Sequence, residues 1–213
     1  MLTLTATSHI FAAMRIGIVS DTHLPNLIRS LDELGPEPAG FFAGVDLILH
    51  SGDLTSPMVL DWLERFAPVV CTTGNNDPIV DARCQELHVM EVHGWRLGMV
   101  HSLRRGFRPM AELQQLFPTP VGVMIAGDTH LERLEYRDGV VVLNSGSPTF
   151  PQHKDLRLGT VGLLEVAPNR LRAEIILLGQ TPGRPNPGRP MALEIRDGQL
   201  ASSANLRDPA DTP

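Results

Sequence analysis

Four apolar runs in the first 126 residues have the composition of buried parallel β-strands. They cover residues 16–19, 45–49, 69–71 and 121–126. Segments with helical spacing lie between them, and we expect helices over residues 27–34, 56–66 and 109–117. Gly35 and Pro36 are expected to end the first helix, and Ser56 and Pro57 to begin the second. Strands that alternate with helices predict a parallel sheet.

The spacing of apolar positions changes to a period of two in the second half of the chain. Alternating strands are expected over residues 133–137, 140–143, 160–166 and 171–178. An earlier hairpin is expected over residues 83–100, with its turn at His93 and Gly94. A parallel half followed by a hairpin-rich half predicts the α/β class, with two sheets packed face to face and helices outside.

The two ends of the chain differ from the region between them. Residues 1–13 predict a flexible N-terminal extension, followed by one domain over residues 14–179. Residues 180–213 are a Pro-rich C-terminal extension, in which residues 181–190 hold too much proline and glycine for regular structure. Residues 191–201 alternate around Asp197 and Gly198 and are compatible with a short hairpin. We expect disorder from Ser202 onward.

Polar stretches follow the expected strands in a fixed order. They are Asp21-Thr22-His23, Gly52-Asp53, Gly74-Asn75-Asn76-Asp77 and Gly127-Asp128-Thr129-His130, with His101 between the last two. Ligands of open α/β sheets bind at the carboxyl ends of the strands, so we expect these groups to converge at one edge. Carboxylates, imidazoles and an amide together suit one or two divalent transition ions. The sequence therefore predicts a metal site.

Composition narrows the class of protein. The 213 residues are 42% hydrophobic and 20% charged, which is typical of one globular domain. A formal charge of −6 gives no support for a dedicated nucleic-acid surface, and no stretch is long and apolar enough to span a bilayer. Cys71 and Cys84 are too few for a disulfide framework, so a cytoplasmic protein is expected. The sequence leaves open whether the protein is a homo-oligomer.

The ordered polar stretches resemble those of the calcineurin-like metallophosphoesterases. Within that family the chain is most similar to the small bacterial and archaeal phosphodiesterase branch. The resemblance runs from Arg15 to Gly179 and includes the late turn at residues 144–148. It implies an αββα sandwich that hydrolyses phosphodiesters or phosphomonoesters, with a small or nucleotide-like phosphate ester as the expected substrate.

The resemblance also implies a set of metal ligands for two divalent ions. The first ion is expected at Asp21, His23, Asp53 and His130, and the second at Asp53, Asn75, His101 and Asp128. Asp53 is the shared ligand, because the two oxygens of a carboxylate can bridge two cations. Mn²⁺ is the favoured metal, with Ni²⁺, Fe²⁺, Zn²⁺ and Mg²⁺ as alternatives.

Two positions depart from the family pattern. Asp128 stands where the family usually has histidine. A carboxylate in place of an imidazole favours hard ions at the second site. Asn76 stands where many relatives have the histidine that protonates the leaving group, and an amide cannot do this. We therefore consider Asn75 and Asp77 as catalytic residues and Asn76 as a phosphate contact. Asp77 could replace the missing acid only if its pKa were raised.

Each candidate residue has a structural alternative. Asp21 and His23 could form a turn and a helix cap, and His101 could be an ordinary histidine at a strand end. Asp128 could hydrogen-bond near the site without ligating. His50 is interpreted as a neighbour of the ligands rather than a ligand. Structural or solvent-exposed positions are expected for the remaining histidines, His9, His88, His93 and His153.

Three classes of function compete at this point. A metal-dependent phosphodiesterase is favoured because the expected ligands of the first ion, Asp21, His23, Asp53 and His130, are all intact. A protein-binding scaffold on the same fold, as in the eukaryotic retromer subunit, is the alternative and predicts eroded ligands. A DNA-repair nuclease is disfavoured, because such relatives carry extra domains and the histidine missing at Asn76.

Overall fold

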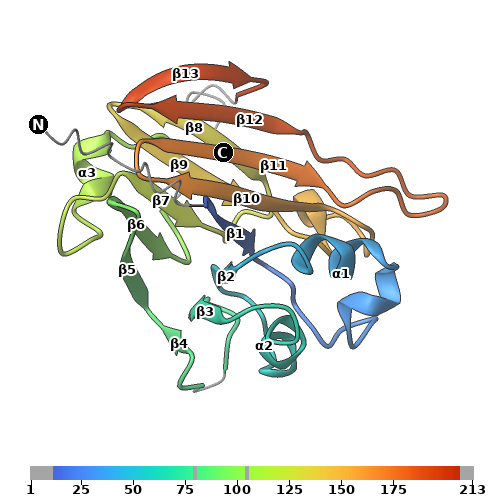
Figure 1. The fold of residues 1–213 in the computed structure, drawn as a ribbon. Helices are drawn as coiled ribbons and strands as arrows, with labels where there is room; N and C mark the ends of the chain where they lie inside the picture. Colours follow the sequence, from blue (N-terminus) through green and yellow to red (C-terminus); the bar gives the residue numbers. More distant parts are fainter. Residues whose placement is uncertain (1–11, 79–80, 104–105, 207–213) are drawn as a thin grey trace, which may run out of the picture.

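Two β-sheets form the body of the protein, as Figure 1 shows. The computed structural model describes residues 12–78, 81–103 and 106–206. The first sheet has the strand order β13-β12-β11-β10-β1-β2-β3-β4. Its strands are β1 (Met14–Val19), β2 (Leu47–His50), β3 (Val69–Thr72), β4 (Cys84–Gln85), β10 (Thr160–Ala167), β11 (Arg170–Leu177), β12 (Met191–Arg196) and β13 (Gln199–Ala204).

The second sheet has five strands in the order β5-β6-β7-β9-β8. They are β5 (Leu87–Val92), β6 (Trp95–Val100), β7 (Val123–Ala126), β8 (Glu132–Arg137) and β9 (Val140–Ser145). Both sheets are mixed: β1, β2, β3 and β4 run parallel, as do β6, β7 and β9, while the other neighbours are antiparallel. In the first sheet the parallel strands form one end, with β4 as the edge strand, and in the second they include the middle strand β7.

Three hydrophobic clusters lie between the layers of sheets and helices and pack them together. The largest lies between the two sheets and includes Ile16 from β1 and Leu143 from β9, neither of which is exposed. A second packs the first sheet against α1 (Glu37–Phe42) and α2 (Met58–Leu63), and contains Phe42 and Leu60. A third packs the second sheet against α3 (Met110–Gln114). Helices therefore cover the outer faces of both sheets, which confirms the expected α/β sandwich.

The prediction of a helix over residues 27–34 is wrong for most of that range. Only Leu31–Leu34 is helical, as the single 3₁₀ turn η1. Ser30 and Glu33 form a capping box that starts this turn, and Gly35 ends it with a left-handed φ of 131°. Because start and stop signals lie so close together, no longer helix can form. The proline-flanked helix α1, which was not expected, follows directly.

The C-terminal extension continues the first sheet. β12 pairs with β11 through partners such as Leu171 and Ile195, and β13 pairs with β12. The expected disorder from Ser202 is wrong as far as Ala204, since these residues complete β13. The division of the chain at residue 179 stays a prediction.

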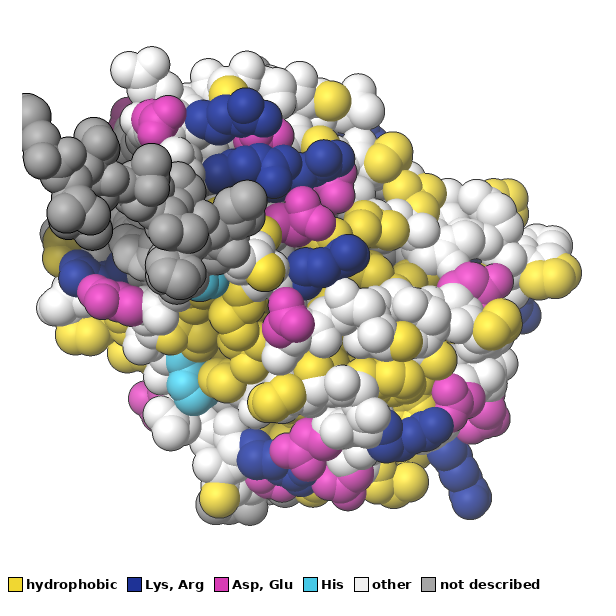
Figure 2. All heavy atoms as spheres, viewed as in Figure 1, with side chains coloured by type: hydrophobic (Ala, Val, Ile, Leu, Met, Phe, Trp, Pro, Cys, Tyr) yellow, Lys and Arg dark blue, Asp and Glu magenta, His cyan; other side chains and the backbone are white. Residues whose placement is uncertain are grey.

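Basic and acidic side chains lie interleaved over β11 and β12, as Figure 2 shows. Arg170 Nε lies 3.0 Å from Glu194 Oε1, so the two strands are also joined by an ion pair. Among the described residues, no helix is long and apolar enough to cross a membrane.

Candidate metal centre

The carboxyl ends of the parallel strands bring the polar stretches together. Backbone hydrogen bonds join the loops that follow β1 and β2, since Asp21 N donates to Gly52 O at 2.9 Å and His23 N to Asp53 O at 3.0 Å. The loops after β6 and β7 are joined by a bond from Gly127 N to His101 O at 2.8 Å. The fold thus fixes the separation of groups that lie far apart in the sequence.

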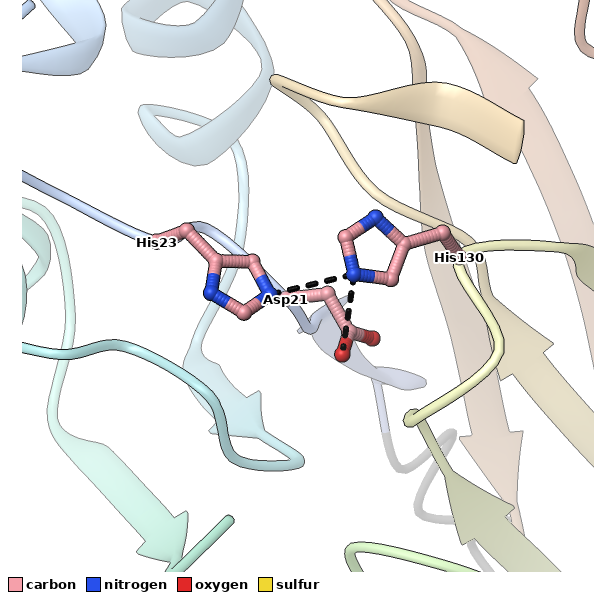
Figure 3. Close-up of side chains that lie close together, drawn as sticks. All are labelled: Asp21, His23 and His130. Carbon is pink, nitrogen blue, oxygen red and sulfur yellow. Dashed lines mark hydrogen bonds and ion pairs between the residues drawn. The ribbon is translucent and has the colours of Figure 1, made fainter. Parts of the chain in front are cut away.

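One cluster consists of Asp21, His23 and His130, which Figure 3 shows pointing toward one another. His130 Nε2 lies 3.0 Å from His23 Nε2 and 3.7 Å from Asp21 Oδ1. The Asp21 side chain is fully buried, and its Oδ2 has no hydrogen-bond partner within the described part of the chain. Burial raises the pKa of Asp21 well above its ordinary value. Such an orphaned buried oxygen fits a cation ligand.

The imidazoles of this cluster are held in the form that binds metals. His130 Nδ1 donates to the Phe150 carbonyl at 2.8 Å, because a carbonyl can only accept, and this leaves the Nε2 lone pair facing the cluster. Burial lowers the pKa of His130 to about 4, and it also lowers the pKa of His23. Both rings are therefore neutral near pH 7, as a metal ligand must be.

A second cluster lies against the first. The candidate ligand atoms of Asp21, Asp53 and His101 lie within 4.8 Å of one another. His101 Nδ1 donates to Ser51 O at 2.7 Å, so its Nε2 lone pair faces Asn75 Oδ1 at 3.0 Å. Two acceptors at this separation fit neighbouring ligands of one ion, whose bonds of about 2.1 Å leave ligand atoms roughly 3 Å apart.

Asp53 lies between the two clusters. Its Oδ2 is 3.6 Å from His23 Nε2 and its Oδ1 is 3.4 Å from His101 Nε2. Asn76 donates to both oxygens, from its backbone N at 2.8 Å and from Nδ2 at 2.6 Å. Asn76 therefore orients the carboxylate that faces both histidines.

Asp128 differs from the other expected carboxylate ligands in its contacts. It lines the cavity described below, but it belongs to neither of the compact groups of candidate ligands among the described residues. Its Oδ2 accepts a hydrogen bond from Ser102 Oγ at 2.7 Å, and its backbone N donates to Asp21 Oδ1 at 3.2 Å. Its role as a ligand stays a prediction.

Asp77 faces the backbone. Its carboxylate accepts from the N–H groups of Asp53 at 2.9 Å, Thr55 at 2.7 Å and Gly74 at 2.8 Å. These bonds join the loops after β2 and β3. An acid at this position would have to give up three hydrogen bonds in order to approach a leaving group, so the geometry favours a positioning role.

Left-handed backbone is concentrated at the site. Positive φ angles of 48° to 72° occur at five expected ligands, which are Asp21, His23, Asp53, Asp128 and His130. Such angles are uncommon for residues other than glycine and mark positions held by their surroundings. Gly52 also has a positive φ, of 93°, and a Cβ there would lie only 2.6 Å from His101 Nδ1. Sharp turns thus aim consecutive side chains into one space.

The helix-cap alternative for Asp21 and His23 is not what the structure has, since the next helical turn begins only at Leu31. His50 is fully buried beside the ligands: its Nδ1 accepts from Gly52 N at 3.1 Å and its Nε2 lies 3.1 Å from Thr22 Oγ1. Burial lowers the pKa of His50 to about 4.

A cavity of about 380 Å³ opens beside both clusters. Its described lining consists of His23, Asn26, Asp53, Asn75, Asn76, Asp128, His130, Phe150, His153 and Lys154. Sequence reasoning missed Asn26, Phe150, His153 and Lys154. The last three follow the turn after β9, whose position at the same sheet edge was the available signal. His153 was expected to be structural or exposed, and its ring stacks on His130 with centroids 4.1 Å apart.

Comparison with known proteins identifies the family. A model of the calcineurin-like phosphoesterase superfamily domain matches residues 14–169. A probable metallophosphoesterase of Methanothermobacter thermautotrophicus is 36% identical over 78% of this chain and 94% of its own length. A probable metallophosphoesterase of Methanocaldococcus jannaschii is 35% identical over 65% of this chain and 70% of its own length.

A solved structure shares the fold at low sequence identity. Vps29 of Entamoeba histolytica complexed with Zn²⁺ has a TM-score of 0.65 and 20% identity, and the match covers 86% of this chain and 99% of the other. At this identity the likeness concerns the fold alone. The family model and the archaeal relatives carry the assignment, and they agree with the clustered carboxylates and imidazoles. The chain therefore belongs to the calcineurin-like phosphoesterase superfamily.

Proposed function

We propose that this protein is a cytoplasmic phosphodiesterase that hydrolyses a small or nucleotide-like phosphodiester with two divalent metal ions. One observation carries the proposal: two groups of candidate ligands share Asp21 and lie beside a cavity large enough for a small ester. Members of both groups, including His23 and Asp53, line that cavity. Family membership supports phosphate-ester hydrolysis as the reaction class.

The proposed ligands divide between the two ions. Asp21, His23, Asp53 and His130 would hold the first ion, and Asp53, Asn75, His101 and Asp128 the second. Oxygen ligands that accompany neutral imidazoles favour Mn²⁺, with Ni²⁺, Fe²⁺, Zn²⁺ and Mg²⁺ as alternatives. When bound, such ions supply Lewis acidity toward phosphate oxygens and lower the pKa of water.

The chain itself positions these groups. Asn76 holds the Asp53 carboxylate through two hydrogen bonds, and the Phe150 carbonyl orients the His130 ring. Asp77 fixes the loops that carry Asp53 and Asn75. The amide of Asn76 cannot protonate a leaving group, and a positioned acid typically contributes about 10²–10⁴-fold. Substrates whose leaving groups need little protonation are therefore expected.

Hydrolysis of bis-p-nitrophenyl phosphate and p-nitrophenyl phosphate tests the proposal. Chelator-treated protein receives Mn²⁺, Ni²⁺, Fe²⁺, Zn²⁺ or Mg²⁺, and its rates are compared with those of Asp53→Ala. We expect metal-dependent cleavage that favours the diester and is lost in the variant. Stoichiometric metal binding without turnover of either ester would contradict the proposal and favour the protein-binding scaffold.

A further inference from the structure

One wall of the cavity is built by the segment Phe150–Lys154, which no expected ligand belongs to. Two consecutive residues of this segment, Gln152 and His153, have left-handed φ angles of 55° and 56°. Gln152 N donates to His130 O at 2.9 Å, and His130 Nδ1 donates to Phe150 O at 2.8 Å. The wall is thus joined directly to a candidate metal ligand by two hydrogen bonds.

The Pro-rich segment fixes the same wall from outside. Gln152 Nε2 donates to Pro187 O at 2.9 Å. Asn186, which is only 9% exposed, anchors that segment by donating to Gly159 O at 2.8 Å and to Gly179 O at 3.0 Å. These residues of the segment lie beyond residue 169, where the match to the family model ends. The segment therefore supports the wall from outside the residues that the family model matches.

Lys154 places a positive charge at the cavity rim. It is the only lysine of the chain and the only described lining residue with a permanent positive charge. Its neighbour Asp155 is held by Arg157 Nη2 at 2.6 Å and lies 3.6 Å from Arg184 Nε. Within the described ranges, the Lys154 ammonium has no hydrogen bond or ion pair. It is exposed and available to an anion.

No other described lining residue carries a permanent positive charge. Asp53 and Asp128 are acidic, while Asn26, Asn75 and Asn76 are neutral. An ester phosphate would meet the candidate ligand clusters and the ions proposed there, while an additional phosphate farther out would meet the opposite charge of Lys154. Away from the proposed metal ligands, the rim at Lys154 is thus the part of the described lining that offers a charged partner to a further negative group.

We propose that Lys154, positioned through the contact between Gln152 and Pro187, binds a second phosphate of the substrate. The preferred substrate class is then a nucleotide phosphodiester that carries an additional phosphate. This inference rests on the proposed phosphodiesterase function and adds to it the specificity at the cavity rim.

A matched pair of substrates tests the inference. Thymidine 5′-(p-nitrophenyl phosphate) is compared with the same ester carrying a 3′-phosphate, using the Mn²⁺-loaded full-length protein. We expect kcat/KM to favour the 3′-phosphorylated ester about fivefold, near the upper value for one exposed ion pair. The ratio of kcat/KM for the 3′-phosphorylated ester to kcat/KM for the plain ester should fall to about one in Lys154→Met. This ratio should persist in Lys154→Arg and be smaller in Gln152→Ala than in the wild type. Arg184→Met, which removes a nearby positive charge outside the cavity, should leave the preference unchanged.

Two failures can be told apart. Cleavage of both esters without a preference, or with the same preference in Lys154→Met, would overturn the inference while the phosphodiesterase proposal stands. Cleavage of neither ester would contradict the phosphodiesterase proposal. Calorimetric binding of thymidine 3′,5′-bisphosphate and thymidine 5′-phosphate then decides the role of Lys154. An affinity ratio that is about fivefold lower in Lys154→Met than in the wild type supports it, and equal ratios exclude it.

Discussion

Two pairs of expected ligands, Asp21 with His130 and Asn75 with Asp128, differ in how firmly the fold holds them. In the first, Asp21 is fully buried and His130 is anchored by a backbone carbonyl. In the second, Asn75 is exposed, and Asp128 accepts a hydrogen bond from Ser102. Buried, backbone-anchored positions tolerate few residue types, whereas a residue of the partly exposed second pair can change without disturbing the core. We infer that the second pair sets metal preference and the first sets the geometry.

Removing the carboxylate that faces one histidine of each cluster should have the largest effect. Asp53→Asn keeps a polar side chain of similar size but removes the charge that faces His23 and His101. We expect kcat/KM for bis-p-nitrophenyl phosphate to fall by about 10³-fold or more, because several kcal/mol of transition-state stabilisation depend on bound metal. Asp61→Asn, on the exposed face of α2, is the matched control. A loss below tenfold in Asp53→Asn would show that Asp53 does not serve both clusters.

His50 gives a pH test of the buried support beneath the clusters. Its pKa of about 4 lies below the ordinary value of 6.5, so the folded state disfavours its protonation. The contribution of neutral His50 to the free energy of unfolding is fully present above pH 6.5 and is lost as the pH falls toward 4. In chelator, the wild type should lose about 2–3 kcal/mol more than His50→Asn between pH 7.5 and 4.5, as measured by urea unfolding. Equal losses would mean that His50 does not titrate with unfolding.

Replacing Asp128 with histidine, the residue that the family resemblance implies at this position, should have a smaller effect. Histidine is a softer ligand than aspartate, so Asp128→His should raise the ratio of Zn²⁺ to Mn²⁺ affinity at the second site by about tenfold. Competitive metal titration measures this ratio, with Asp138→His in the exposed turn between β8 and β9 as control. An unchanged ratio would assign Asp128 only its hydrogen bond to Ser102.

Most of the strands could be predicted from the sequence, because apolar runs and turn residues encode them locally. The convergence of the polar stretches was also expected, and the structure brings Asp21, His23 and His130 together. The wall of Phe150 and Lys154 could not be predicted, because its position depends on Gln152 reaching Pro187, a contact between segments that no local pattern records. The helix predicted over residues 27–34 was wrong because the prediction followed the apolar spacing, whereas Ser30 and Gly35 limit the helix to a single turn.

Metal stoichiometry, measured together with turnover, tests the central claim most directly. Chelator-treated protein is titrated with Mn²⁺ in a calorimeter, and diester hydrolysis is measured on the same samples. The account predicts two equivalents bound by the wild type and one by His101→Ala, with hydrolysis appearing only as the second equivalent binds. Full activity with a single equivalent, or two equivalents retained in His101→Ala, would contradict the proposed two-metal centre.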